Sequence, residues 1–196
     1  MLEGVTFTFS FRRHADRLEL GYRIFNGRSD EVAVLDQIRG VGIDGAPDYA
    51  PGAVYVDLEG PLLRLTKGTL PVPEGVFPGV YPIPDARLIA AGASREQRFD
   101  VPVPVKVCNP FRRRGHGQVV AAREAVAREV LVGVGVVPSG KSCAFTRSNP
   151  AFPDVVSVLW LEARPGVQLD CQTIFSERFP LDEDLPVLDY EGFPWP

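Results

Sequence analysis

The sequence predicts an all-β protein: a two-sheet antiparallel β-sandwich of about eight to ten strands, with at most one short helix. Several segments alternate apolar and polar residues with the two-residue period of a strand that is buried on one face. The 196 residues also include 19 prolines and 19 glycines, a proportion typical of many short strands joined by tight turns. Only one segment has the composition of a helix.

Three strands are expected in the first 38 residues. Residues 5–11 alternate valine and phenylalanine with threonine and serine, and residues 18–24 repeat the pattern with leucine, tyrosine and isoleucine. Residues 32–36 form a third alternating run. The link Asn26–Asp30 begins with Asn-Gly, which favours the left-handed residues of a tight turn. We therefore expect a hairpin between the second and third strands.

The middle of the chain contains a second hairpin. Arg39–Gly52 is rich in glycine, aspartate and proline and is expected to be a loop. Ala53–Gly68 then predicts two strands that turn at a Glu-Gly pair. Residues 70–86 form an extended proline-rich connection. Arg95–Val105 is expected to be an edge strand, because its prolines cannot donate backbone hydrogen bonds.

Gln118–Glu129 is the segment with helical composition, although it also suits the start of a long strand that continues to residue 137. Two further strands are expected at Asp154–Ala163 and Val167–Phe179. No internal repeat or linker interrupts the chain, so we expect one domain over residues 1–196. Its last part, residues 180–196, is expected to be an acidic and aromatic tail.

The composition limits the classes of function. A net charge of −4 gives no general attraction to nucleic acid or to an anionic membrane, and no stretch is apolar enough to cross a bilayer. The N-terminal residues do not resemble a signal peptide. Cys108, Cys143 and Cys171 are odd in number and lack metal-ligand spacing, which favours a reducing compartment over a disulfide framework or a metal site. We therefore expect a cytoplasmic protein without a cofactor.

One motif points to nucleotide chemistry. Residues 135–142, Gly-Val-Val-Pro-Ser-Gly-Lys-Ser, match the phosphate-binding pattern G-x-x-x-x-G-K-[ST]. Such a loop needs free backbone N–H groups and a following helix, but this segment carries two valines and a proline and is followed closely by Pro150. A β-turn is the simpler interpretation. The alternative is a nucleotide-dependent enzyme that uses Gly135, Gly140, Lys141 and Ser142.

Two segments suggest contact with another protein. A basic loop at Asn109–Gly117 contains three consecutive arginines, which suit a phosphate or a carboxylate-rich partner, although a solvated loop has the same composition. The C-terminal residues place aromatic side chains between prolines, and these rings belong either at an interface or over an edge of their own sandwich. The predicted partner-binding residues are Arg112, Arg113, Arg114, Tyr190, Phe193 and Trp195.

Other chemistry has little support in the sequence. Cys108 and His116 could form a nucleophile and a base, but no third group orients them. Exposed tyrosines such as Tyr49, Tyr55 and Tyr81 would suit a sugar-binding sandwich, with no further signal for it. The strand pattern loosely resembles immunoglobulin domains without their Cys…Trp…Cys spacing. The sequence thus favours a non-catalytic binding or assembly module that recognises another protein or a second copy of itself. Recognition is expected through loops such as Arg112–Arg114, the proline-rich segment, a sheet edge or the C-terminal tail.

Overall fold

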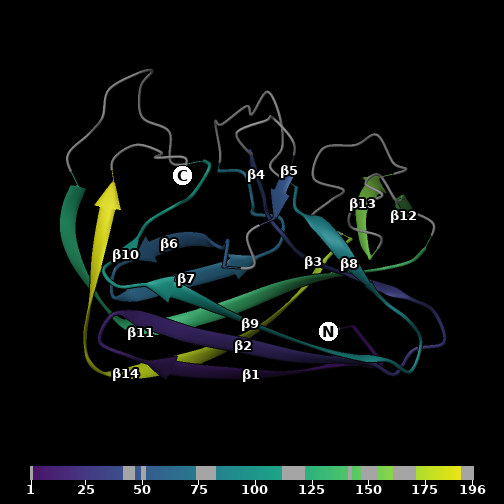
Figure 1. Ribbon diagram of the computed structural model, residues 1–196, viewed down its shortest axis with the longest axis horizontal. Coiled ribbons are helices and arrows are strands. Elements are labelled where there is room, and N and C mark those ends of the chain that lie inside the picture. Colours follow the sequence, from purple (N-terminus) through teal and green to yellow (C-terminus); the bar gives the residue numbers. More distant parts are fainter. Residues whose placement is uncertain are drawn as a thin grey trace.

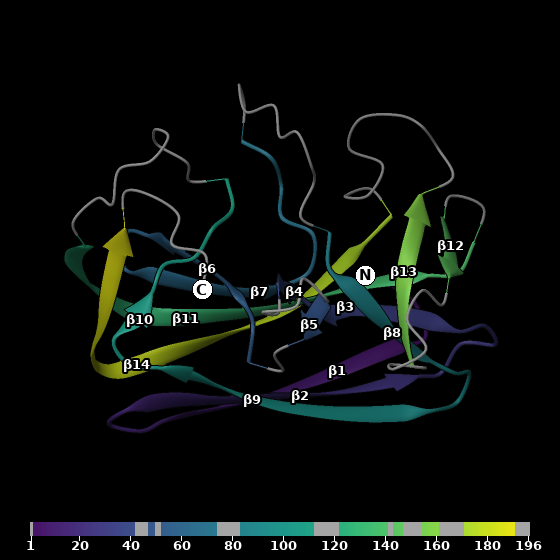
Figure 2. The same cartoon turned by 45° about the horizontal axis from the view of Figure 1, so that its top comes forward.

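Two open β-sheets and a separate short hairpin contain the strands that the structure describes (Figure 1). The computed structural model describes residues 2–41, 47–49, 52–73, 83–111, 122–140, 143–146, 154–160 and 171–190. These ranges contain strands and no helix, which confirms the predicted all-β class. In Figure 2 the smaller sheet forms the lower layer, and the long strands of the larger sheet pass above it.

The smaller sheet has three strands and the larger has nine. The order in the smaller sheet is β1 (Val5–Arg13), β2 (Arg17–Asn26) and β9 (Ser94–Pro102). The order in the larger sheet is β10 (Val105–Lys106), β14 (Thr173–Tyr190), β11 (Ala122–Pro138), β3 (Val32–Gln37), β8 (Asp85–Ile89), β13 (Val155–Trp160) and β12 (Cys143–Thr146). Two further strands branch from this order: β7 (Leu62–Lys67) pairs with β11, and β6 (Tyr55–Glu59) pairs with β7. A separate hairpin contains β4 (Arg39–Val41) and β5 (Pro47–Tyr49).

The strands number fourteen in the described ranges, more than the eight to ten that the sequence predicts. The excess comes from short strands such as β4, β5 and β10, which are too brief to show an alternating pattern. The sandwich is also not purely antiparallel, because β7 runs parallel to β11 and β10 runs parallel to β14. The hairpin of β6 and β7 is confirmed, and Gly60 supplies its turn with a φ of 58°.

The core lies between the two layers. On the smaller sheet, alternate residues of β2, among them Leu18, Leu20 and Ile24, are buried and face the larger sheet. Leu63 and Leu65 of β7 and every second residue of β11 meet them from the other side. The same alternation places the intervening residues of β7 and β11 on the outer face of the larger sheet.

The segment with helical composition is a strand. Gln118–Ala121 lies outside the described residues, but Ala122–Glu129 forms the first half of β11, so the short helix is wrong there and the long strand is right. Residues Ala122–Ala127 pair with Tyr190–Leu185 of β14, and Ala127 is fully buried. Pairing with a neighbouring strand and burial on one face thus outweigh the small helical preference of alanine, arginine and glutamate.

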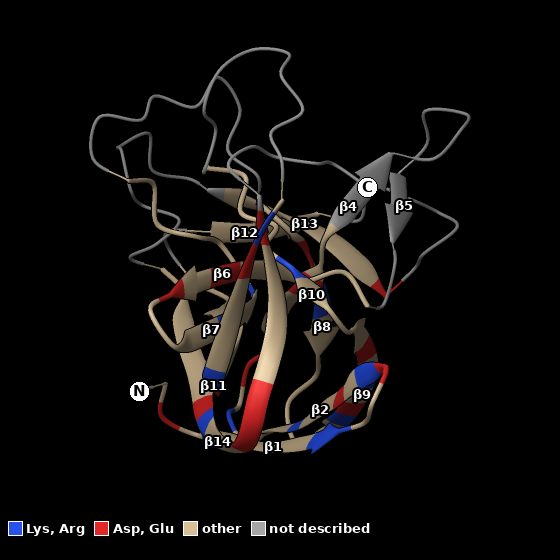
Figure 3. Cartoon of the chain, turned by 90° about the vertical axis from the view of Figure 1, so that its left-hand side faces the viewer, with Lys and Arg blue, Asp and Glu red and all other residues tan. Residues whose placement is uncertain are grey.

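Residues 180–190 belong to the larger sheet, although the sequence assigns them to a tail. β14 bends where residues 181–184 bulge away from Arg128 of β11, and Leu185 and Val187 beyond the bend are buried. Figure 3 shows acidic residues at this bend. Arg128 Nε lies 3.0 Å from Asp184 Oδ1, so this base of β11 forms an ion pair with an acid at the bend of β14. Residues 191–196 lie outside the described ranges.

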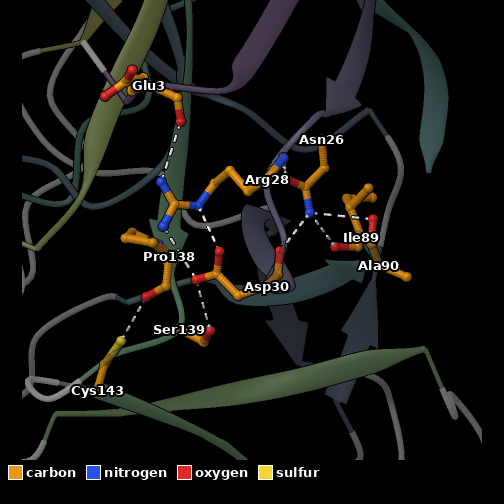
Figure 4. Close-up of polar contacts among 9 residues, drawn as sticks. All are labelled: Glu3, Asn26, Arg28, Asp30, Ile89, Ala90, Pro138, Ser139 and Cys143. Atoms are coloured by element: carbon orange, nitrogen blue, oxygen red, sulfur yellow. Dashed lines mark hydrogen bonds and ion pairs between the residues drawn. The ribbon is translucent and has the colours of Figure 1, made fainter. Parts of the chain in front are cut away.

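The expected hairpin at Asn26–Asp30 is wrong, because this segment carries the chain from one sheet to the other. β2 pairs with β1 and β9, whereas β3 pairs with β11 and β8. Asn26 is fully buried, and its side-chain Nδ2 donates to the carbonyls of Asp30, Ile89 and Ala90 at 2.9, 3.0 and 3.2 Å (Figure 4). Its Oδ1 accepts from the N–H of Arg28 at 3.1 Å. The asparagine therefore holds a corner by side-chain hydrogen bonds and needs no left-handed turn.

Replacement of Asn26 by alanine is expected to lower the free energy of unfolding by about 2–3 kcal/mol, because buried carbonyls lose their donor. Urea unfolding followed by circular dichroism measures this change. Asn109→Ala is the matched control, since the Asn109 side chain accepts one hydrogen bond, from the N–H of Phe111, and its removal is expected to cost less than about 1 kcal/mol. Equal losses in the two variants would contradict the role of the corner.

Candidate functional site

Most of the predicted partner-binding residues lie outside the described ranges. This applies to Arg112, Arg113, Arg114, Phe193 and Trp195. Tyr190 is the last residue of β14 and lies opposite Ala122 in the ladder with β11, and the position of its side chain is not described. Partner binding through these residues therefore stays a prediction. The site must be sought among the side chains that the structure does describe.

The phosphate-loop match coincides with the end of a strand. Val136–Pro138 pairs with β3, the N–H of Ser139 donates to the carbonyl of Glu31, and Gly140 forms a β-bridge with Cys143. Lys141 and Ser142 lie outside the described residues, and the next described segment is the strand β12. These pairings use backbone groups that a phosphate would need. The φ of Gly140 is not in the left-handed region.

Gly135 has a packing role that does not involve a ligand. A Cβ atom at this position would lie 2.7 Å from Gln172 Oε1 and 3.2 Å from Gly68 Cα. Glycine therefore allows the chain after β7 to cross close to β11. Ser139 Oγ also lies 3.3 Å from a carboxylate oxygen of Asp30, whose pKa is lowered mainly by the hydrogen bond from Arg28. A negatively charged neighbour is unfavourable for a phosphate.

A cluster of ionisable groups is enclosed between the sheets. Tyr22 Oη of the smaller sheet donates to Asp36 Oδ2 of β3 at 2.5 Å, and Gln37 Nε2 donates to Asp36 Oδ1 at 2.7 Å. Lys67 Nζ donates to the carbonyls of Ala53 at 2.7 Å and Asp36 at 3.4 Å. Asp36 and Lys67 are 2% and 1% exposed, so a substrate cannot reach them without opening the sandwich.

Burial shifts the pKa values in this cluster. The pKa of Lys67 falls to about 8, mainly because burial disfavours its charged form, while the Asp36 charge opposes the fall. The pKa of Tyr22 rises well above its usual value, first through burial and then through the charge and hydrogen bond of Asp36. The Lys67 ammonium also lies 4.5 Å from the ring centroid of Phe99. These side chains form hydrogen bonds and charge contacts with one another, and they contribute to the stability of the fold.

An open cleft lies on the outer face of the larger sheet. Its volume is about 490 Å³. Leu131 and Gly133 of β11 and Ile174 of β14 form an apolar floor, and Ile174 is 42% exposed. Polar side chains from four different elements stand around it. They are Asp57 of β6, Arg64 and Thr66 of β7, Asn109, and Ser176 of β14.

One wall of the cleft is the start of the proline-rich segment, Thr69–Pro73. The side-chain amide of Gln172 holds this wall by two hydrogen bonds, accepting from the N–H of Thr69 at 3.1 Å and donating to its carbonyl at 2.7 Å. This pairing imitates one rung of a β-ladder. Thr69 Oγ1 is buried in the wall and has no hydrogen-bond partner within the described part of the chain. A ligand that reaches this oxygen would satisfy it.

The charges beside the cleft are mixed. Arg64 lies directly opposite Asp57 in the β6–β7 ladder, and its guanidinium donates to Glu59 at 2.8 and 3.1 Å. The guanidinium of Arg64 therefore already has a carboxylate partner within its own hairpin. No group of three or more His, Cys, Asp or Glu residues suited to a metal ion occurs among the described residues. The cleft thus offers shape and apolar surface, with polar groups for orientation.

Sequence reasoning missed the cleft because it is made by residues from four strands and two segments outside the strands, Thr69–Pro73 and Asn109. One signal was present in residues 130–135, Val-Leu-Val-Gly-Val-Gly, where every second residue is valine and the other face carries two glycines. Glycine inside a strand marks close approach of another chain or a hollow surface. The second of these glycines, Gly135, also begins the phosphate-binding pattern, for which the sequence favours a β-turn.

Comparisons of this chain with protein-family models, with curated proteins and with solved structures found no match.

Lys67 is expected to make the stability of the fold depend on pH. The folded pKa is about 8 and the unfolded value about 10.5, so between these values the unfolded chain holds a proton that the folded chain has released. The free energy of unfolding therefore rises with pH in this window, by at most about 1.4 kcal/mol per pH unit, and the gain is lost as the pH falls towards 8.

Urea unfolding of the wild type and Lys67→Met at pH 7 to 10 isolates this effect, because titration of the other groups is common to both chains. The difference between the two is expected to be flat below pH 8 and to grow above it in favour of the wild type. Lys106→Met, at an exposed position of β10, is the control and should follow the wild type. Parallel curves for the wild type and Lys67→Met would contradict the prediction.

Removal of the Gln172 side chain is expected to loosen the cleft wall. Two hydrogen bonds of about 1 kcal/mol each hold Thr69, so Gln172→Ala should raise local opening at Thr69 by about tenfold or more. Hydrogen exchange of the Thr69 amide measures this opening, and the amides of β2 serve as internal controls that should not change. An unchanged exchange rate at Thr69 would show that other contacts hold the wall.

Proposed function

We propose that this protein is a non-catalytic binding module whose cleft receives an extended segment of another protein. The observation that carries the proposal is the cleft itself, in which an apolar floor is left exposed among polar side chains. A protein that binds such a cleft typically inserts apolar or aromatic side chains into it and is oriented by hydrogen bonds at the rim. The proline-rich wall is one of the segments for which the sequence predicts recognition of a partner.

Several features support binding over catalysis. Lys67 and Tyr22, whose pKa values are displaced mainly by burial, both form hydrogen bonds with Asp36 inside the sandwich. Arg64, the cation beside the cleft, is bonded to Glu59. A nucleotide-dependent activity at residues 135–142 gains no support from the strand pairing of Val136–Pro138. We therefore propose a role in recognition or assembly, without a cofactor.

The cytoplasm is the proposed location. Cys108, Cys143 and Cys171 are free thiols, and their odd number and spacing favour a reducing compartment. Across the described ranges, no helix has the length and apolar character needed to cross a membrane. The likeness to immunoglobulin domains is likewise a proposal: the two open sheets agree with it, and the parallel pairs β7–β11 and β10–β14 depart from it.

A photo-crosslinking amino acid in the cleft tests this function. Ser176 is exposed on β14 and lines the cleft, whereas Ser94 is exposed at the start of β9 in the smaller sheet. With p-benzoylphenylalanine at Ser176, irradiation of the cells that make the protein should yield one defined protein adduct. The same residue at Ser94 should not yield that adduct. Mass spectrometry of the cross-linked peptides identifies the bound segment.

A second variant tests whether the adduct depends on the cleft. Thr66→Trp places a large ring between the walls and should lower the yield of the adduct at least tenfold, while Thr146→Trp on the exposed edge strand β12 should leave it unchanged. Circular dichroism confirms that both variants fold. Identical adducts from Ser176 and Ser94, or a small-molecule adduct alone, would contradict a protein-binding cleft.

A further inference from the structure

The first strand leaves one edge of the smaller sheet open. β1 pairs with β2 along its whole length, from Val5 opposite Asn26 to Arg13 opposite Leu18. Within the described ranges, no strand pairs with the other side of β1. Such an edge presents a row of backbone N–H and C=O groups without strand partners and can accept a further strand. β1 lies at the border of the smaller sheet in both overall views (Figures 1 and 2).

β1 lacks the features by which other edges in this structure resist pairing. β9, the opposite edge of the same sheet, carries alternating charges and ends in Pro102. The edge strands β10 and β12 are two and four residues long, and β6 is bridged through Val56 to Cys108. β1 has nine residues and no proline, and its only charges are Arg12 and Arg13 at its end. An edge of this kind is the one expected to pair.

The inner face of β1 presents aromatic rings at this edge. Phe7, Phe9 and Phe11 are each partly exposed. Phe7 stacks on Phe175 with ring centroids 4.6 Å apart, and Phe11 stacks on Phe179 at 5.2 Å, so β1 packs on β14 of the larger sheet. Phe9 stacks on Phe7 alone, at 5.6 Å. Apolar ring surface therefore remains along the open edge, available to a further strand.

We propose that β1 pairs antiparallel with β1 of a second copy of this chain, so that two three-stranded sheets continue as one. The strand is complementary to itself in this direction. With the two-fold axis at Phe9, that residue faces its own copy, Phe7 faces the partner's Phe11, and Thr8 faces the partner's Ser10. Arg12 faces the partner's Thr6, so no like charges meet. Parallel pairing in register would instead place the arginines of the two copies side by side.

This symmetric contact pairs side chains of the same chemical type on both faces of the strand. Aromatic rings meet aromatic rings on the inner face, and hydroxyl groups meet hydroxyl groups on the outer face, which are favourable cross-strand pairs. A foreign strand would need the same pattern to match, whereas a second copy supplies it by symmetry. The contact is remote in sequence from the cleft residues and does not rest on the function proposed for the cleft.

Sedimentation velocity of the full chain tests this interface. The wild type is expected to have the mass of a dimer, twice 21.5 kDa, and to dissociate into monomers on dilution. Thr8→Lys/Ser10→Lys places two charges on the exposed face of β1 and should raise the dissociation constant at least tenfold, because lysines meet across the axis. Phe25→Lys/Ser94→Lys adds the same charge to the same outer face, away from the β1 edge, and should remain dimeric.

Hydrogen exchange of the wild type keeps the test decisive if the lysine variant does not fold. At dimer concentrations, the amides of Phe7, Phe9 and Phe11, which point away from β2, should be protected, and dilution to monomer should expose them while β2 is unchanged. A wild type that is monomeric at all concentrations, a Thr8→Lys/Ser10→Lys variant that still dimerises, or protection gained elsewhere would overturn the proposal. A heterologous strand found at β1 would overturn it as well.

Discussion

Asp36 joins the two sheets by polar contacts within an otherwise apolar core. Its carboxylate accepts from Tyr22 of the smaller sheet and from Gln37 beside it, and its carbonyl accepts from Lys67 of β7. A buried ammonium is unfavourable unless acceptors surround it, so Lys67 has few alternative positions. The alternation of β7 then follows: Lys67 and Leu65 point into the core, and Thr66 points out to the cleft. The buried cluster thus helps to set the register of a strand that lines the cleft.

The cleft and the β1 edge use different physical properties of the same sandwich. The cleft depends on residues too small to fill the outer face, chiefly Gly133, and on the Gln172 amide that holds Thr69 across the sheet. The β1 edge depends on backbone groups left without a strand partner in the described ranges. In the roles that we propose, the cleft would select a partner by shape and apolar area, whereas the β1 edge would select it by strand pattern. A module with both surfaces would hold a partner and assemble with its own copies.

Local patterns predicted the parts of the fold that depend on neighbouring residues. The strands β1, β2 and β3 and the β6–β7 hairpin were predicted correctly, because a two-residue period and a Glu-Gly turn act over a few residues, although β3 is buried on both faces. Asn26 was misinterpreted for the same reason. Asn-Gly is a local signal for a hairpin, but the side chain of Asn26 bonds to Ile89 and Ala90, more than sixty residues away. Those partners cannot be known from the residues around it.

The sequence by itself determined that this chain is all-β and that strands such as β1 and β2 bury one face. Composition and period decide these properties. Only the tertiary structure decided that Ala122–Glu129 is a strand, since pairing with β14 outweighs its helical propensity. It also decided the cleft and the open edge. Both arise where strands distant in sequence meet or fail to meet, and strand order is a property of the folded chain as a whole.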